Sequence, residues 1–128
     1  MTLKDHLETL ISMDRLALAY REFGEQEKSI PLYETCLKLR SQLLGENHNL
    51  TLASMNNLAL AHYKNGDHEK AIPLYEQTLK RRIAIYGEDH LHTVTTKQNL
   101  ALAYQDAGDL EKSTRMLEEA LQATRKAV

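Results

Sequence analysis

The chain has 128 residues, of which 42% are hydrophobic and 27% charged, and its formal net charge is -2. This length holds one domain with a modest core. The near-neutral charge argues against a nucleic-acid binder, which more often shows a clustered basic surplus. The sequence contains neither an apolar run long enough to cross a membrane nor a signal-peptide pattern, so a cytoplasmic location is expected.

The sequence repeats itself every 42 residues. Residues 3–44, 45–86 and 87–128 are called repeats one, two and three. Repeats one and two share 20 of 42 residues, and repeats two and three share 15. The segments LALAYREFG, LALAHYKNG and LALAYQDAG recur at the same place in each, and each ends on a glycine. Such periodicity indicates a stack of equal structural units with no residual domain.

Each repeat is predicted to hold two helices. In repeat two, apolar residues at intervals of three and four predict one helix over 51–64 and a second over 68–86. Gly66 suits the left-handed conformation that ends a helix, and Gly87 ends the second helix. Thr93 is the expected N-cap of the next helix. In repeat one, Thr2-Leu3-Lys4-Asp5 is typical of a capping box, so that helix begins either near residue 3 or near Thr9.

Residue size is kept at equivalent positions of the three repeats, as close packing between stacked repeats requires. Cys36 falls in a column of small residues, and we interpret it as a small buried side chain rather than a reactive thiol or half of a disulfide. Large residues that should pack between helices recur in two columns: Leu16, Leu58 and Leu100, and Leu37, Leu79 and Leu121.

The pattern GENHxxTLASMNNLALAHYKNGDHEKAIPLYEQTL of repeat two, repeated in part by repeat three, resembles the tetratricopeptide repeat in the 42-residue form of kinesin light chains. Asn49 and Leu91 replace the proline that this family usually has in the loop. The resemblance covers nearly the whole chain. It implies an all-α fold, a right-handed superhelical solenoid of three helix-turn-helix repeats with six helices, forming a single domain over 1–128.

The resemblance also implies that the first helix of each repeat lines a concave face that binds a protein or peptide. Asn and Gln side chains there could pair with any peptide backbone, and three leucines would form an apolar floor. Alternatively, Asn57 and Asn99 hold adjacent helices together. The positions carried onto this chain are Asp14, Arg15, Leu18, Arg21, Asn56, Asn57, Leu60, Tyr63, Lys64, Gln98, Asn99, Leu102 and Gln105, with Ile11, Glu22, Ala53, Thr95 and Asp106 beside them.

Other polar clusters favour structural roles. His6, His48 and His90 lie a repeat apart, so hydrogen bonding in loops is favoured over a shared metal ion. Lys38 with Arg40, and Lys80-Arg81-Arg82, are interpreted as solvated faces near helix C-termini. No phosphate loop or nucleophile motif occurs in the sequence, so we expect neither an enzyme nor a cofactor.

These observations favour a non-catalytic scaffold that binds a peptide or helix of a partner protein in its concave groove. The alternative is a structural module that oligomerises by end-to-end stacking of its terminal repeats or by exchange of helices. Neither hypothesis involves nucleic acid or a membrane.

Overall fold

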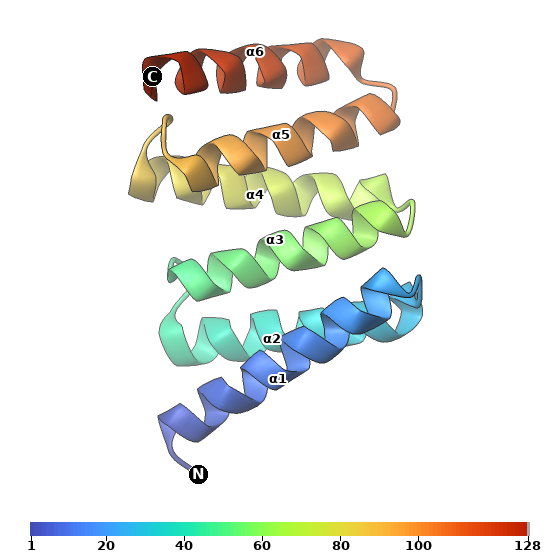
Figure 1. The fold of residues 1–128 in the computed structure, drawn as a ribbon, viewed down its shortest axis with the longest axis vertical. Helices are drawn as coiled ribbons and strands as arrows, with labels where there is room; N and C mark the ends of the chain where they lie inside the picture. Colours follow the sequence, from blue (N-terminus) through green and yellow to red (C-terminus); the bar gives the residue numbers. More distant parts are fainter. Residues whose placement is uncertain (128) are drawn as a thin grey trace.

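The computed structural model describes residues 1–127, with side chains up to Lys126. Within that range the chain forms six α-helices and no strand. The helices are α1 (Leu3–Glu22), α2 (Gln26–Leu44), α3 (Asn49–Lys64), α4 (His68–Tyr86), α5 (Leu91–Asp106) and α6 (Leu110–Ala127). They follow one another as antiparallel neighbours in a single stack, with α1, α3 and α5 in front of α2 and α4 in Figure 1. The predicted all-α repeat fold is confirmed.

The first helices of repeats two and three begin earlier than predicted. Their N-caps are His48 and His90, whose Nδ1 atoms accept hydrogen bonds from the backbone N–H groups two residues on, at 3.1 and 3.0 Å. The prediction of Thr93 as an N-cap was therefore wrong, because this threonine lies buried within α5. The loop hydrogen bonding predicted for His48 and His90 is confirmed, whereas His6 lies within α1 and is exposed.

Helix α1 starts where its capping sequence indicates. The Thr2 side chain accepts a hydrogen bond from the Asp5 N–H at 3.2 Å, and the Asp5 carboxylate accepts one from the Thr2 N–H at 3.0 Å. This reciprocal pair satisfies two backbone donors that a helix N-terminus otherwise leaves free. Of the two predicted starts for α1, the one near residue 3 is correct.

Short connections fold each helix back on the last. Gly66 has a φ of +78°, and Gly87 has a φ of +89°, a left-handed conformation that residues with a Cβ rarely adopt. After Gly66, the Asp67 N–H donates to the His62 carbonyl at 2.9 Å and so closes the end of α3. The glycine positions predicted from the sequence are therefore the turns of the fold.

The two larger core clusters join neighbouring repeats, while a smaller one, Val94 with Ala120 and Ala123, lies within repeat three. One cluster joins repeats one and two through Ala17, Tyr33, Leu58 and Ala61. A second joins repeats two and three through Ala59, Ala71, Tyr75, Leu79, Leu100, Ala103 and Tyr104. Each helix pair thus buries its apolar face against its neighbour, as stacked repeats must.

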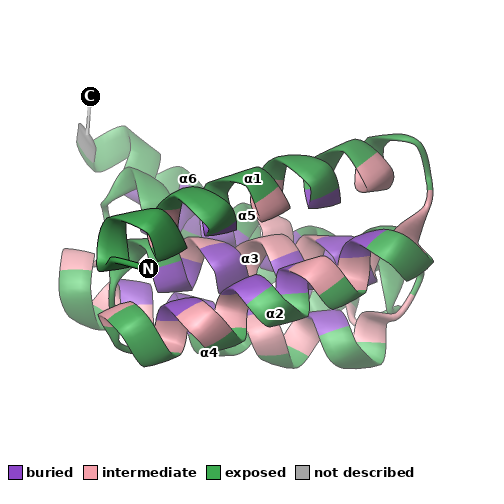
Figure 2. Cartoon of the chain, turned by 90° about the horizontal axis from the view of Figure 1, so that it is seen from below, coloured by how far each residue is buried: buried purple, intermediate pink, exposed green. Residues whose placement is uncertain are grey.

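The predicted packing columns hold inside the stack and fail at its ends. Leu58, Leu79 and Leu100 are buried, but Leu16 is 47% exposed and Leu121 is 51% exposed. The reason is position, because α1 and α6 each have a neighbouring helix on one side only in this chain. Figure 2 shows the contrast between a largely exposed α1 and a more deeply buried α3.

Cys36 is fully buried, as its column of small residues predicts. Its Sγ lies 3.8 Å from the Leu10 carbonyl oxygen of α1. Burial raises the pKa of the thiol to about 12, so it stays protonated at neutral pH and is a poor nucleophile. The interpretation as a structural cysteine is confirmed.

Repeat two contains a buried histidine where the other repeats have tyrosine. His62 aligns with Tyr20 and Tyr104, and the Tyr104 hydroxyl donates to the Glu76 carboxylate at 2.7 Å. Burial lowers the pKa of His62, an effect that outweighs the opposing pull of the Asp67 carboxylate. The folded state therefore resists protonation of this ring more than the unfolded state does.

This difference predicts that acid destabilises the chain through His62. In the unfolded chain His62 has a pKa of about 6.5, so below this pH the unfolded state binds the proton more readily than the folded state. Stability therefore decreases as the pH falls, until the pH passes below the lowered pKa of His62 in the folded state. We expect His62→Tyr to weaken that dependence and to raise stability, because its hydroxyl can reach Glu34, the equivalent of Glu76. Urea unfolding at pH 7.5 and pH 5.5 measures both effects. An unchanged pH dependence would contradict this role for His62.

Candidate protein-binding surface

The thirteen residues predicted to bind a partner all lie on α1, α3 and α5, the helices at the front of Figure 1. They therefore share one layer of the fold. Within that layer their exposure and contacts differ, and these differences decide which of them are free to meet a partner.

Three leucines at the same position of each repeat run along this layer. Leu18 and Leu102 are 42% and 49% exposed, which is unusual for large apolar side chains in the middle of packed helices. Leu60 is half-buried and packs on the core cluster that joins repeats two and three. Together they offer an apolar row that the fold itself does not cover.

The predicted amides divide into two groups. Gln98 and Gln105 are exposed on α5, so their donors and acceptors are available. Asn57 and Asn99 are half-buried. Asn56 is also half-buried, and its Oδ1 is shielded from solvent with no hydrogen-bond partner among the described residues. Such an acceptor would gain from a donor supplied by a ligand or by water.

Two of the predicted charged residues are already engaged. Asp14 forms an ion pair with the buried Arg40 of α2 at 2.5 Å. Arg21 is mostly buried, lies 5.9 Å from the centroid of the Tyr33 ring, and pairs with Glu22 at 3.6 Å. Arg15 and Lys64, by contrast, are exposed. The free charge on this surface is thus small, because the cations of Arg15 and Lys64 are partly offset by the exposed carboxylate of Asp106.

A side-chain hydrogen bond crosses the layer between repeats two and three. The Tyr63 hydroxyl of α3 donates to the Asp106 carboxylate of α5. That hydrogen bond to a carboxylate raises the pKa of Tyr63 and keeps the phenol protonated. The bond links α3 and α5 at one end of the surface.

Two buried arginines were misjudged from the sequence. Arg40 and Arg82 are 4% and 6% exposed, so interpreting their basic runs as solvated faces was wrong at these positions. Arg40 donates to Ser54 at 2.7 Å, and Arg82 donates to Thr96 at 2.8 Å. Each bond joins the second helix of one repeat to the first helix of the next. The spacing of 42 residues between the two arginines was the feature of the sequence that indicated a shared structural role.

A buried lysine was also missed. Lys97 is 2% exposed at the position that Met55 fills in repeat two. Its ammonium group pairs with the Glu88 carboxylate of the preceding loop and with Glu119 of α6 at 3.6 Å. This pairing compensates the burial of the charge and connects both helices of repeat three with the loop before them.

The described residues contain no group of three metal-ligating side chains placed to hold one ion. No helix within residues 1–127 is both long and apolar enough to cross a membrane. The surface of α1, α3 and α5 presents leucines, amides, the cations Arg15 and Lys64, and the exposed Asp106 carboxylate.

A stack of helix-turn-helix units with such a face defines a helical-repeat protein. The sequence pattern of the tetratricopeptide repeat matches residues 9–84 and 51–126, two overlapping matches offset by one repeat. The chain therefore belongs to the tetratricopeptide repeat family, whose members are generally protein-interaction scaffolds. Among curated proteins, none matches the chain.

Solved structures of similar proteins agree with this assignment. Nearly identical TPR-like repeats of a kinesin light chain from Podosopora anserina share 27% identity with a TM-score of 0.86, covering 94% of this chain and 57% of theirs. BtubC from P. vanneervenii is 24% identical with a TM-score of 0.82, covering 89% of this chain and 45% of its own. The TPR domain of Arabidopsis FLU is 18% identical with a TM-score of 0.78, and the match covers 93% of this chain and 97% of the FLU domain.

The kinesin light chain resemblance predicted from the sequence is confirmed. The chain spans little more than half of the two Podosopora anserina structures, at 57% and 58% of their length. The likenesses to BtubC and FLU, both below 25% identity, show the shared fold.

The buried arginine contact predicts a specific loss of stability. Replacing Arg40 by Ala leaves Asp14 and Ser54 without their partner, and we expect unfolding free energy to fall by about 2–3 kcal/mol. Lys38→Ala, at an exposed position on the same helix, should change it by less than about 0.5 kcal/mol. Urea unfolding followed by circular dichroism measures both. Equal effects of the two substitutions would show that the Arg40 contact adds nothing.

Proposed function

We propose that the chain is a non-catalytic scaffold that binds a peptide segment or helix of a partner protein on the concave face of α1, α3 and α5. The observation that carries the proposal is the leucine row, in which Leu18 and Leu102 are exposed and Leu60 is half-buried, with amides on the same helices. Family membership supports the class of function, since these repeats generally bind proteins.

The composition of the face indicates the kind of segment that fits. Apolar side chains of a partner would cover the leucines, and the amides of Gln98 and Gln105 would pair with its backbone. The free cations are Arg15 and Lys64, while Arg21 is mostly buried and Asp14 is held by Arg40. Two exposed cations are too few to grip a carboxylate terminus on their own, so the proposed ligand is apolar and polar rather than strongly acidic.

The expected affinity is modest. Three repeats offer a small surface, and a flexible ligand must lose conformational freedom when it binds. A dissociation constant in the micromolar range, which corresponds to a binding free energy of about -8 kcal/mol, is consistent with these costs.

This proposal predicts that binding depends on exposed groups of α5. We expect a double substitution, Gln98→Glu and Leu102→Glu, to weaken binding at least about tenfold, because it removes an apolar contact and adds repulsive, strongly hydrated charge. The probe is a displayed library of short linear peptides selected on the wild-type chain. Affinities of the selected peptides are then measured by fluorescence anisotropy for both chains.

The matched control carries the same chemical change on the opposite layer. Gln77 and Ile85 are exposed on α4, so Gln77→Glu with Ile85→Glu alters charge and hydrophobicity equally. Circular dichroism confirms that both variants keep their helices. If the α4 variant lost binding and the α5 variant kept it, the concave face would not be the binding surface.

Self-association through the terminal helices is a second candidate. Leu16 of α1 and Leu121 of α6 are about half exposed, and helix faces of this kind can stack between copies. A molar mass that rises with concentration would support it, whereas a constant 14.6 kDa would favour the concave face.

A further inference from the structure

Each repeat has a hollow at the same place, where the last turns of its second helix lie beside the start of its first helix or the loop before it. The hollows of repeats one, two and three have volumes of about 130, 300 and 260 Å³. They follow one another along the edge of the stack that holds the connections between repeats and both chain ends in Figure 1, here named the inter-repeat edge. Two equivalent positions line all three hollows: Leu39 and Gln42, Arg81 and Ala84, and Ala123 and Lys126.

The inter-repeat edge stays open in the middle of the stack as well as at its ends. Repeat two has a repeat on each side, and its Leu58 and Leu79 are buried. On the inter-repeat edge of the same repeat, Lys80 is exposed and Ile85 is 45% exposed. Stacking therefore does not use this edge, and the exposure of Ile85 does not come from an end of the chain.

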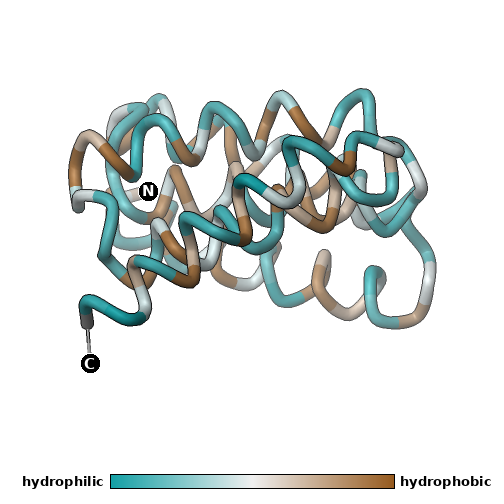
Figure 3. Tube along the Cα trace, turned by 90° about the horizontal axis from the view of Figure 1, so that it is seen from above, coloured by the Kyte–Doolittle hydropathy of each residue, from teal (hydrophilic) through white to brown (hydrophobic). Residues whose placement is uncertain are grey.

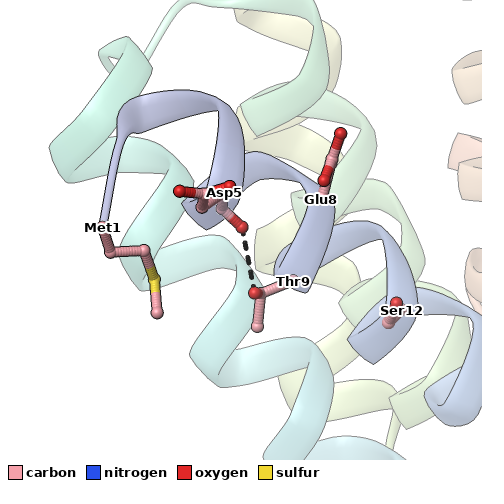
Figure 4. A pocket seen from close by; sticks show the side chains of 5 residues that line it. All are labelled: Met1, Asp5, Glu8, Thr9 and Ser12. Carbon is pink, nitrogen blue, oxygen red and sulfur yellow. Dashed lines mark hydrogen bonds between the residues drawn. The ribbon is translucent and has the colours of Figure 1, made fainter.

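The hollow of repeat one is shaped by the chain's own first turns. In repeat two the Thr51 hydroxyl donates to the Gly45 carbonyl of the preceding loop at 2.8 Å. The equivalent Thr9 donates instead to the Asp5 carbonyl of its own helix at 3.0 Å, the dashed line in Figure 4. The residues that form a loop in repeat two are thus helical in repeat one, so the hollow there is bordered by α1 itself.

The lining of this first hollow is mainly apolar. Leu10 is buried, Leu39 is half-buried and Leu43 is 38% exposed. Leu39 stands where repeat two has Arg81, and Leu43 stands where it has Ile85. An apolar side chain of a partner would cover these leucines and remove their surface from water.

The hollow of repeat two carries positive charge. Lys80 is exposed and has no ion-pair partner among the described residues. The Arg81 guanidinium donates to the Glu46 carbonyl at 3.2 Å and lies 3.6 Å from the Glu46 carboxylate, so the loop holds it beside the hollow. That ion pair is weak, because the Glu46 side chain is 73% exposed. The lining therefore favours an acidic side chain, with Ile85 as an apolar wall.

The hollow of repeat three is acidic. Glu88, Asp89 and Glu119 line it together with the cations Lys97 and Lys126. Lys97 pairs with Glu88 and Glu119, whereas Asp89 is exposed and forms no ion pair with a described residue. Figure 3, viewed from the α6 end, shows that the part of α6 beside the C label is mostly hydrophilic. The carboxylates outnumber the cations, so this hollow favours a basic side chain.

We propose that the three hollows together form a docking surface for one extended segment of a partner protein. The segment places an apolar side chain on repeat one, an acidic side chain on repeat two and a basic side chain on repeat three. The proposal rests on the complementarity of these groups to a hollow that keeps its place while its lining changes from repeat to repeat. This surface is separate from the concave face, so it does not depend on the proposed function.

The spacing of the repeats suits an extended chain. Packed helices lie about 8–10 Å apart, so two successive hollows are separated by at most roughly 20 Å. An extended chain covers that distance with about six residues. Because each exposed ion pair contributes little by itself, the three contacts are needed together, and the order of the side chains along the segment becomes the recognised feature.

The test compares two synthetic peptides of the same composition. The first carries pairs of leucines, glutamates and lysines in that order, set about six residues apart by Gly-Ser spacers. The second exchanges the glutamates with the lysines, and in neither chain direction can it match all three hollows. We expect the first peptide to bind at low salt, and the second to bind at least about tenfold more weakly, in fluorescence anisotropy.

Two protein variants locate the contact. Lys80→Glu with Arg81→Gln removes the positive charge of the second hollow, so it should weaken binding of the first peptide at least about tenfold. The same variant should bind a peptide in which the glutamates are replaced by lysines. Lys112→Glu with Arg115→Gln makes the same changes at exposed positions of α6 outside the hollows, and it should bind the first peptide as the wild-type chain does. Circular dichroism checks that both variants keep their helices.

Each remaining outcome counts for or against the docking surface. NMR shifts at Leu43, Ile85 and Gln122 with the first peptide support it. Shifts confined to Leu60 and Leu102 would place the peptide on the concave face and refute it. Absence of binding to the wild-type chain, equal binding of the two peptides, or equal effects of the two protein variants would also refute it. If the Lys80 and Arg81 variant loses helicity, Lys80→Gln alone replaces it, with an expected loss of about threefold.

Discussion

The structure depends on the junction between the second helix of one repeat and the first helix of the next. The two helices of one repeat carry apolar groups on faces that they cannot cover for each other. Tyr33 and Tyr75 fill these faces from one side, and Leu58 and Leu100 meet them from the other. Leu117 of α6 is equivalent to Tyr33 and Tyr75 but has no following repeat beside it in this structure, and it is half exposed. Stability is therefore a property of neighbouring repeats together.

This arrangement gives each first helix two separate duties. Residues such as Ser54 and Leu58 face the preceding repeat and are buried by it. The residues at Leu60 and Lys64 lie on the remaining side, where only a part of each is covered. A change on the second set disturbs few packed contacts, so this side of α1, α3 and α5 can vary in chemistry while the stack is kept. That separation supports the proposal that a partner is bound on α1, α3 and α5.

The period of 42 residues and the apolar spacing within it predicted the helices and the glycine turns, whereas the layer that holds the candidate site was implied by the family resemblance. The period did not predict the starts of α3 and α5, because His48 and His90 cap these helices with a ring nitrogen where serine or threonine is usual. It also placed Arg40 in solvent, since arginine is mostly exposed and its partners, Asp14 and Ser54, lie on two other helices. Such partners become visible only when the repeats are stacked.

Burying an arginine between two helices carries a large desolvation penalty. Its contribution here is to the alignment of the two helices along their axes. Its desolvation offsets much of the attraction to Asp14, so an apolar side chain could give similar stability. Apolar faces of leucine and alanine would, however, tolerate a shift along the helix axis. A guanidinium does not tolerate such a shift, because Arg40 must reach the Ser54 hydroxyl and Arg82 must reach the Thr96 hydroxyl. The two arginine contacts thus align repeats one, two and three with one another.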